Sequence, residues 1–162
     1  MNGKAFAAAL TVVMATLSAC YQSTAYFRYF STPIEGWERD SVLHYHVPAV
    51  RAAGLYVEEI GVRPSATYPF KQLSLVVDQK IISTNDSHSN IFKSDTNIID
   101  VYDDEGHLRG KGIDLRQLVT PVKGLRLQAG DSIAMAIRHN MRRYAIEGIS
   151  DVGLKVTRAY GD

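Results

Sequence analysis

The sequence predicts an all-β fold, a single antiparallel β-sandwich of jelly-roll or immunoglobulin-like type with little helix. Three observations lead to this prediction. Apolar residues recur at every second position in runs of strand length, which is the period of a half-buried strand. Gly, Pro or short polar segments separate the runs. Tyrosine is plentiful, and aromatic residues favour strands. About seven to nine such runs indicate a sandwich rather than an α/β fold.

The first half of the chain supplies the earlier strands in order. Residues 26–30 (YFRYF) are aromatic and are expected to open the sheet, and Pro33 and Gly36 mark the turn that follows. Residues 48–53 break the period as a loop or a brief turn, and residues 84–90 are expected to form a polar loop. The alternating runs of this half lie at residues 42–47, 55–62 and 72–78.

The second half begins with a predicted hairpin. Residues 98–105 run into an acidic stretch that ends at Gly106, and acidic residues before a Gly predict a short turn with that Gly at positive φ. Residues 133–137 and 152–156 alternate again and predict the last strands. Residues 139–146 break the period, either as a bent strand or as one helical turn.

The N-terminus carries a targeting signal. Lys4 precedes an uncharged apolar run, residues 5–17, which leads to Leu-Ser-Ala-Cys with Cys20 as its last residue. This is the layout of a secretory signal peptide, and the run is shorter than the roughly 20 residues of a membrane span. Cys20 is the only cysteine, so its position predicts lipid attachment there, against the alternative of a chance cysteine after an ordinary cleavage site. We expect a signal peptide at 1–19, a lipid-anchored leader at 20–33 and the β-sandwich domain at 34–160.

Composition and charge exclude several classes of function. Of the 18 Lys and Arg residues, Lys4 lies in the signal peptide, which leaves 17 against 17 Asp and Glu. A neutral domain lacks the net basic surface that nucleic acid requires. With Cys20 acylated, no thiol remains for a disulfide or for nucleophilic catalysis, so the fold depends on its apolar core.

Two groups of residues have side chains that could ligate a metal. His44 and His46 leave the same face of a predicted strand, but a third ligand would have to come from a distant residue such as His88, His107 or His139. A solvated face explains the pair better. The acidic residues 100–105 suggest calcium only weakly, because the adjacent Gly106 fits a hairpin turn better than a calcium loop. The sequence therefore predicts no metal site.

Motifs for catalysis are not found. The sequence has no Gly-x-Ser-x-Gly elbow, no His-Glu-x-x-His pair and no phosphate-cradling glycine loop. We therefore predict no catalytic residue, no cofactor and no enzymatic activity. Trp37, the only tryptophan, is a speculative ligand contact, because an exposed aromatic ring on a β-sandwich can stack on a sugar. The alternative, which we favour, is that Trp37 plugs one end of the sandwich.

Segments spread over the mature chain also suggest a family. The chain contains, in order, residues 36–41 (GWERDS), 60–63 (IGVR), 68–77 (YPFKQLSLVV), 102–112 (YDDEGHLRGKG), 137–142 (IRHNMR) and 146–156 (IEGISDVGLKV). With the cysteine box, their order and spacing resemble the gliding-motility lipoproteins of the GldH type, found in the Bacteroidetes. The resemblance implies a cell-envelope lipoprotein associated with gliding machinery, and an envelope role that is not known in relatives that do not glide. It supplies no catalytic residues.

Two functions are compatible with these observations. The first is a non-catalytic envelope protein, anchored in the membrane by acylated Cys20, that binds other envelope proteins and no nucleic acid. The alternative is a glycan-binding module that uses Trp37 or surface tyrosines. We expect an outer-membrane location facing the periplasm, because the residues after Cys20 include Gln22 but no acidic residue before Glu35, whereas surface-exported lipoproteins of this phylum tend to carry acidic residues there.

Overall fold

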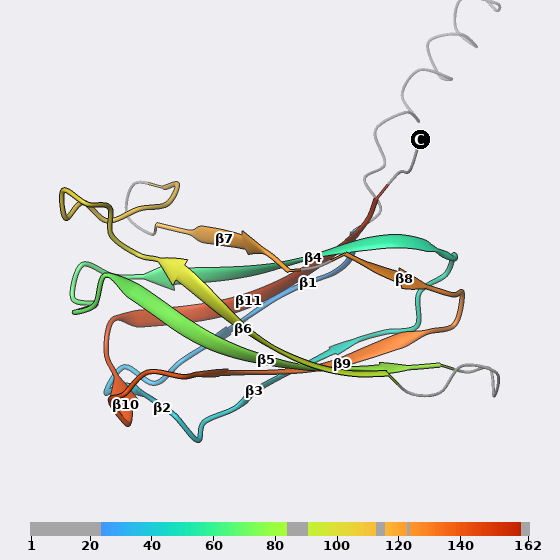
Figure 1. The fold of residues 1–162 in the computed structure, drawn as a ribbon, viewed down its shortest axis with the longest axis horizontal. Coiled ribbons are helices and arrows are strands. Elements are labelled where there is room, and N and C mark those ends of the chain that lie inside the picture. The colour runs from blue at the N-terminus through green and yellow to red at the C-terminus, as the bar shows by residue number, and fades with distance from the viewer. Residues whose placement is uncertain (1–23, 84–90, 113–115, 123, 160–162) are drawn as a thin grey trace, which may run out of the picture.

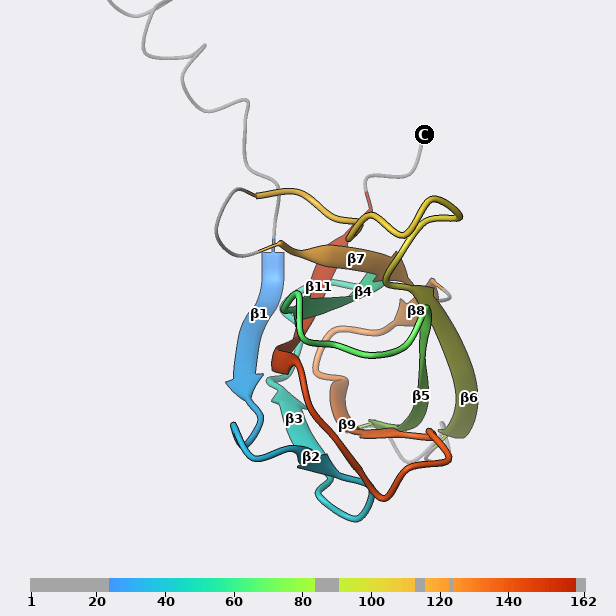
Figure 2. The same cartoon turned by 90° about the vertical axis from the view of Figure 1, so that its left-hand side faces the viewer.

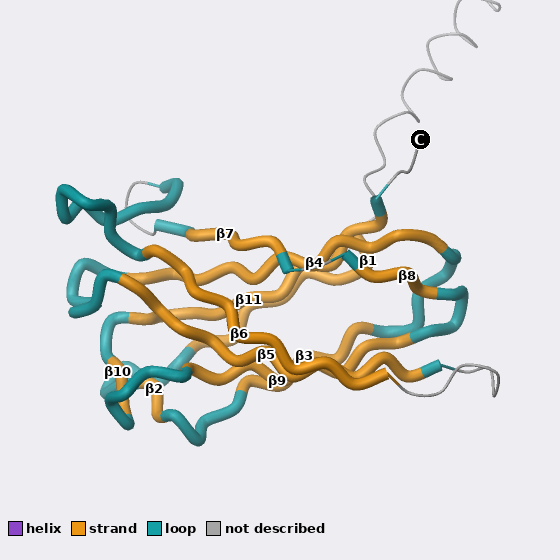
Figure 3. Tube along the Cα trace, in the orientation of Figure 1, coloured by secondary structure: helices purple, strands orange, loops and turns teal. Residues whose placement is uncertain are grey.

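A computed structural model describes residues 24–83, 91–112, 116–122 and 124–159. The expected signal peptide, Cys20 and the expected polar loop at 84–90 lie outside these residues. The described residues form strands, turns and loops but no helix (Figure 3). The strands are β1 (Thr24–Ser31), β2 (Trp37–Glu38), β3 (Leu43–Val47), β4 (Gly54–Pro64), β5 (Gln72–Ile82), β6 (Ile91–Asp100), β7 (Leu118–Pro121), β8 (Leu125–Leu127), β9 (Ser132–His139), β10 (Ala145–Ile146) and β11 (Ile149–Arg158).

The strands build two sheets that lie face to face (Figure 1). One sheet has the order β1-β11-β4-β7, with β8 also paired to β4, and the other has the order β3-β9-β5-β6. Every pairing in both sheets is antiparallel. β2 and β10 form a small separate pair at the left-hand end of the sandwich in Figure 1, the side that faces the viewer in Figure 2. The predicted antiparallel, sandwich-like all-β fold is confirmed.

The core lies between the sheets and follows the predicted period of two. In β5 and β9 alternate residues are buried, because successive side chains of a strand point to opposite faces. Each large apolar side chain buried in this way contributes about 1.5–3 kcal/mol. The fully buried members of the core include Ile60, Leu73, Leu75, Ile133, Ile137, Val152, Leu154 and Val156.

The turns agree with the sequence in part. Gly36 and Gly106 have positive φ, 132° and 84°, as a turn glycine allows. The chain after Gly106 returns only as an isolated bridge between Tyr102 and Leu108, and not as a strand of either sheet. Residues 139–146 contain no helical turn; β9 ends at His139, and the chain bends before β10.

The first strand of the sandwich contains residues 26–30, which were expected to open the sheet, although the expected domain bounds began at residue 34. The expected leader, residues 20–33, includes β1, which pairs with β11 along its length. The reason is a long-range contact. Tyr29 lies opposite Gly153, which lies opposite Gly61, and a Cβ at either glycine would collide with the Tyr29 ring. The Arg63 guanidinium stacks over the same ring at 4.1 Å from its centroid. The two glycines thus make room for an aromatic residue that joins β1 to the domain.

Candidate functional site

The outer face of the β3-β9-β5-β6 sheet carries a groove of about 740 Å³. Strand register explains its shape. One row across the sheet reads His46, Ala134, Lys80 and Phe92, in order from β3 to β6. The small alanine lies on the inner strand β9, and longer side chains stand on both sides of it. The next row repeats this pattern with Ala136 in the same central position. The groove is lined by His44, Tyr45, His46, Asp78, Gln79, Lys80, Phe92, Lys93, Ser94, Ala134, Met135 and Ala136.

Polar groups in this groove are held by one another. Asp78 receives a hydrogen bond from Ser94 Oγ at 2.5 Å and pairs with Arg138 Nη1 at 2.6 Å. The Ser94 hydrogen bond, followed by the contacts with Arg138, lowers the pKa of the Asp78 carboxyl below its ordinary value. Asp78 is therefore ionised, and the charge of Arg138 balances its negative charge. Lys80 Nζ lies 5.1 Å from the centroid of the Phe92 ring, a cation–π contact. The groove is thus suited to binding, with an apolar floor and an aromatic side wall.

His44 and His46 are exposed on the outer face, as the favoured interpretation of this pair expected. The other candidate ligands lie elsewhere: His139 is buried, and His107 belongs to the acidic turn. His88 lies outside the described residues. The structure therefore brings none of the described candidate ligands to the histidine pair.

The acidic turn does gather possible ligands. Among the described residues, Asp103, Glu105 and His107 are the one group of three whose ligand atoms lie within 4.8 Å of one another. The backbone N–H of His107 donates to Asp103 Oδ1 at 2.7 Å, and this bond is the main reason that the pKa of Asp103 is lowered. Hydrogen bonds of a tight turn thus account for the arrangement without an ion.

Trp37 is fully buried, with 0% of its surface exposed. Its Nε1–H donates to the carbonyl oxygen of Ser41 at 2.7 Å, and its ring meets the His139 ring edge-on at 5.3 Å. His139 Nε2 donates in turn to the Trp37 carbonyl oxygen at 3.0 Å, and burial lowers the pKa of His139. Trp37 offers no ring face to a sugar. The speculative ligand contact is corrected to a core plug, because burial of the ring removes a large apolar area from water.

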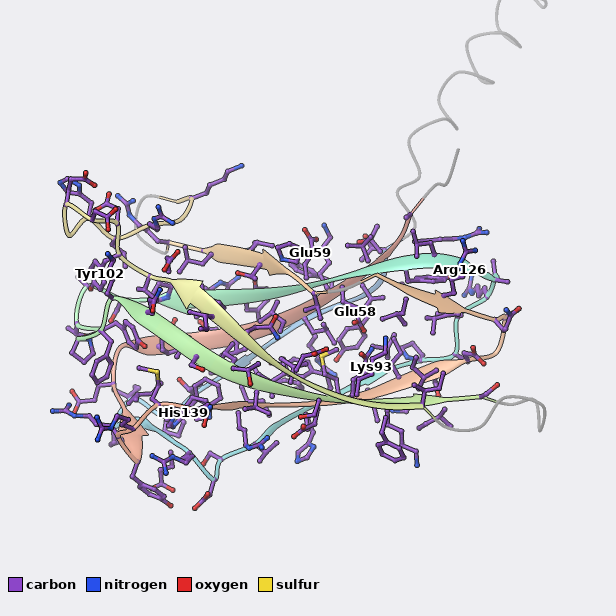
Figure 4. The ribbon with its side chains drawn as sticks, in the orientation of Figure 1. Glu58, Glu59, Lys93, Tyr102, Arg126 and His139 are labelled. Atoms are coloured by element: carbon purple, nitrogen blue, oxygen red, sulfur yellow. The ribbon has the colours of Figure 1, made fainter. Side chains whose placement is uncertain are left out.

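Sequence reasoning missed one buried polar group, Glu58. Glu58 has no exposed surface, because it lies on the face of β4 that packs against the other sheet (Figure 4). Gln79 Nε2 donates to Glu58 Oε1 at 2.5 Å, and Oε2 has no hydrogen-bond partner among the described residues. Burial raises the pKa of Glu58 from 4.5 to about 7, although the charge of Lys93 and the Gln79 hydrogen bond act in the opposite direction. The period of two in this strand could have predicted the burial of Glu58, since Glu58 lies on the same face as Tyr56 and Ile60.

Most of the chain matches the model of a known protein family. The model of the GldH lipoprotein family matches residues 24–156, from the first residue of β1 into β11. The chain belongs to the GldH lipoprotein family. The family resemblance expected from the sequence is confirmed. The chain is thus a gliding-motility-type lipoprotein with a lipid-anchored place in the cell envelope.

Two further comparisons add little to the GldH assignment. No curated protein matches the chain. Among solved structures, the chain is similar to Eiger TNF from S. frugiperda, with 12% identity, a TM-score of 0.36, and coverage of 84% of this chain and 93% of that one. Within the described residues of this GldH-family member, no helix has the length and apolar character to cross a bilayer.

Proposed function

We propose that this GldH-family chain is a non-catalytic assembly component, which binds another envelope protein in the groove of its four-stranded sheet. The groove itself carries the proposal. In this groove Ala134 and Ala136 leave an apolar floor between two histidines and an aromatic ring. Its acidic group, Asp78, is already paired with Arg138, which favours binding over acid–base chemistry.

The proposed anchor holds the domain close to the membrane. Cys20 precedes the first residue of β1, Thr24, by four positions, and four Cα steps of 3.8 Å span at most about 15 Å. Thr24 pairs with Thr157 near the end of β11, so this end of the sandwich is nearest the lipid. We place the domain on the periplasmic side of the outer membrane, since no acidic residue follows Cys20 before Glu35.

A photo-reactive amino acid at His46 tests the groove in intact cells. We expect a covalent product between this chain and a second envelope protein that faces the periplasm, because His46 is exposed beside the groove floor. The matched control is the same amino acid at Arg126, which is exposed on β8 of the other sheet (Figure 4). Mass spectrometry of the product identifies the partner. Equal capture from both positions would contradict the groove proposal, and a partner found only on the cell surface would contradict the orientation.

Lipid attachment is tested by labelling cells with radioactive palmitate. The wild-type chain is expected to incorporate the label, and the Cys20→Ser variant to lose it entirely, because Cys20 is the only thiol in the sequence. Immunoblotting of both proteins checks that they are present in equal amounts. Label in the Cys20→Ser protein would rule out this residue as the attachment point.

A further inference from the structure

β6 is the longest edge strand in the described part of the fold. It pairs with β5 from Ile91 to Asp100 in a regular register. The other edge strands carry features that discourage pairing. β1 has an irregular register near its start, β7 has four residues and ends in Pro121, β8 has three, and β3 has five and is followed by Pro48. β6 has neither a proline nor an irregularity.

The outer edge of β6 has no strand partner among the described residues, and we call it the free edge. The N–H of Val101 donates to the carbonyl oxygen of Lys71, so the odd-numbered residues of β6 exchange hydrogen bonds with β5. The even-numbered residues therefore direct their N–H and C=O groups away from β5. β6 also carries exposed apolar side chains: Phe92 is 71% exposed, Ile98 62% and Ile91 49%. A regular edge with apolar side chains is a template for another strand.

We propose that a second copy of this chain occupies the edge, with the two β6 strands antiparallel about a two-fold axis at Ser94. In this register Lys93 of each copy lies opposite Asp95 of the other, so the contact holds two pairs of opposite charge. Neither residue forms an ion pair with another described residue. Phe92 lies opposite Thr96 of the second copy and diagonal to its Ile98, within reach of an aromatic side chain.

The neighbouring registers are less favourable. An axis at Asp95 places two Asp95 carboxylates opposite each other, and an axis at Lys93 does the same with two ammonium groups; like charges directly opposite are destabilising. An axis at Thr96 places Lys93 opposite Ile99. In all four registers even-numbered residues lie opposite one another, so that their outward N–H and C=O groups bond in pairs, and the side chains alone favour the axis at Ser94. The result is one continuous sheet across two copies, which leaves the groove floor of each copy open.

Cysteine cross-linking in native membranes tests the two-fold axis. In the Ser94→Cys chain the two introduced cysteines, one from each copy, have Cα atoms about 5.5 Å apart, within disulfide range. The matched control is Thr96→Cys, on the same face and strand and also exposed. Its two copies lie four residues apart along the strands, about 14 Å. Mild oxidation is expected to give a dimer on a non-reducing gel from Ser94→Cys, at least about tenfold above that from Thr96→Cys. No dimer from Ser94→Cys, or equal yields from both, would overturn the proposal.

Exchange of charges then tests the identity of the occupant. On the Ser94→Cys chain, Lys93→Glu and Asp95→Lys are each expected to lower the dimer yield about tenfold, because each puts like charges opposite one another. The double variant restores opposite pairs and is expected to recover the yield. A strand from a different protein keeps its own charges, so the exchange within β6 would not restore its pairing, and a double variant that stays as low as the single ones would overturn the second copy as the occupant.

Discussion

Replacement of Gly148 by alanine is expected to destabilise the fold by about 2–5 kcal/mol, a large part of the roughly 5–15 kcal/mol of a typical domain. Gly148 has a φ of 81°, which costs a side chain about 1–2 kcal/mol. An added Cβ would also lie 2.5 Å from the Cα of Tyr68 and 2.9 Å from the carbonyl carbon of Thr67. These are backbone atoms, so they move only with their loop, and overpacking of this kind costs about 1–3 kcal/mol.

Gly106 provides the matched control for this substitution. Its φ is 84°, but nothing lies within 4 Å of an added Cβ. Gly106→Ala therefore measures the cost of the backbone conformation alone, about 1–2 kcal/mol. Unfolding in denaturant, followed by the fluorescence of the buried Trp37, gives both values. Equal losses for the two variants would show that the Tyr68 loop yields freely and that the close contact carries no cost.

Replacement of Glu58 by glutamine is expected to stabilise the protein above about pH 7 and to change little near pH 4. The folded protein holds the Glu58 proton up to a pKa of about 7, against 4.5 ordinarily. The unfolded chain releases that proton first as the pH rises, so the wild type loses stability from about pH 4.5 until pH 7 is passed. Two and a half pH units at about 1.4 kcal/mol each amount to a loss of about 3.5 kcal/mol.

Glutamine removes this titration and keeps the contact. Its side-chain oxygen can still accept the hydrogen bond that Gln79 donates to Glu58 Oε1. The measurement is the free energy of unfolding of both proteins at about pH 4, 6 and 8. Their difference cancels the contribution of the groups that the two proteins share. A difference that stays constant over this range would mean that Glu58 titrates normally in the folded protein.

Local patterns in the sequence were enough to predict most of the strands. The alternation in residues 133–137 and 152–156 became β9 and β11, and Gly106 took the positive φ that its acidic neighbours predicted. The same alternation placed Glu58 on the buried face of β4. It was missed because a carboxyl group is expected in solvent, and only the contact with Gln79 shows how one of its oxygens is satisfied.

The sequence by itself determined the strand period and part of the turns, because each of these depends on residues that are neighbours in the chain. Only the tertiary structure decided which strands lie together. That arrangement buried Trp37 against His139, set Gly148 against the backbone of Tyr68, and left β6 with a free edge. It also built the groove, whose alanine floor lies on β9 and whose walls come from β3, β5 and β6. These features depend on the register between segments far apart in the chain, and register is settled when the two sheets pack their apolar faces together.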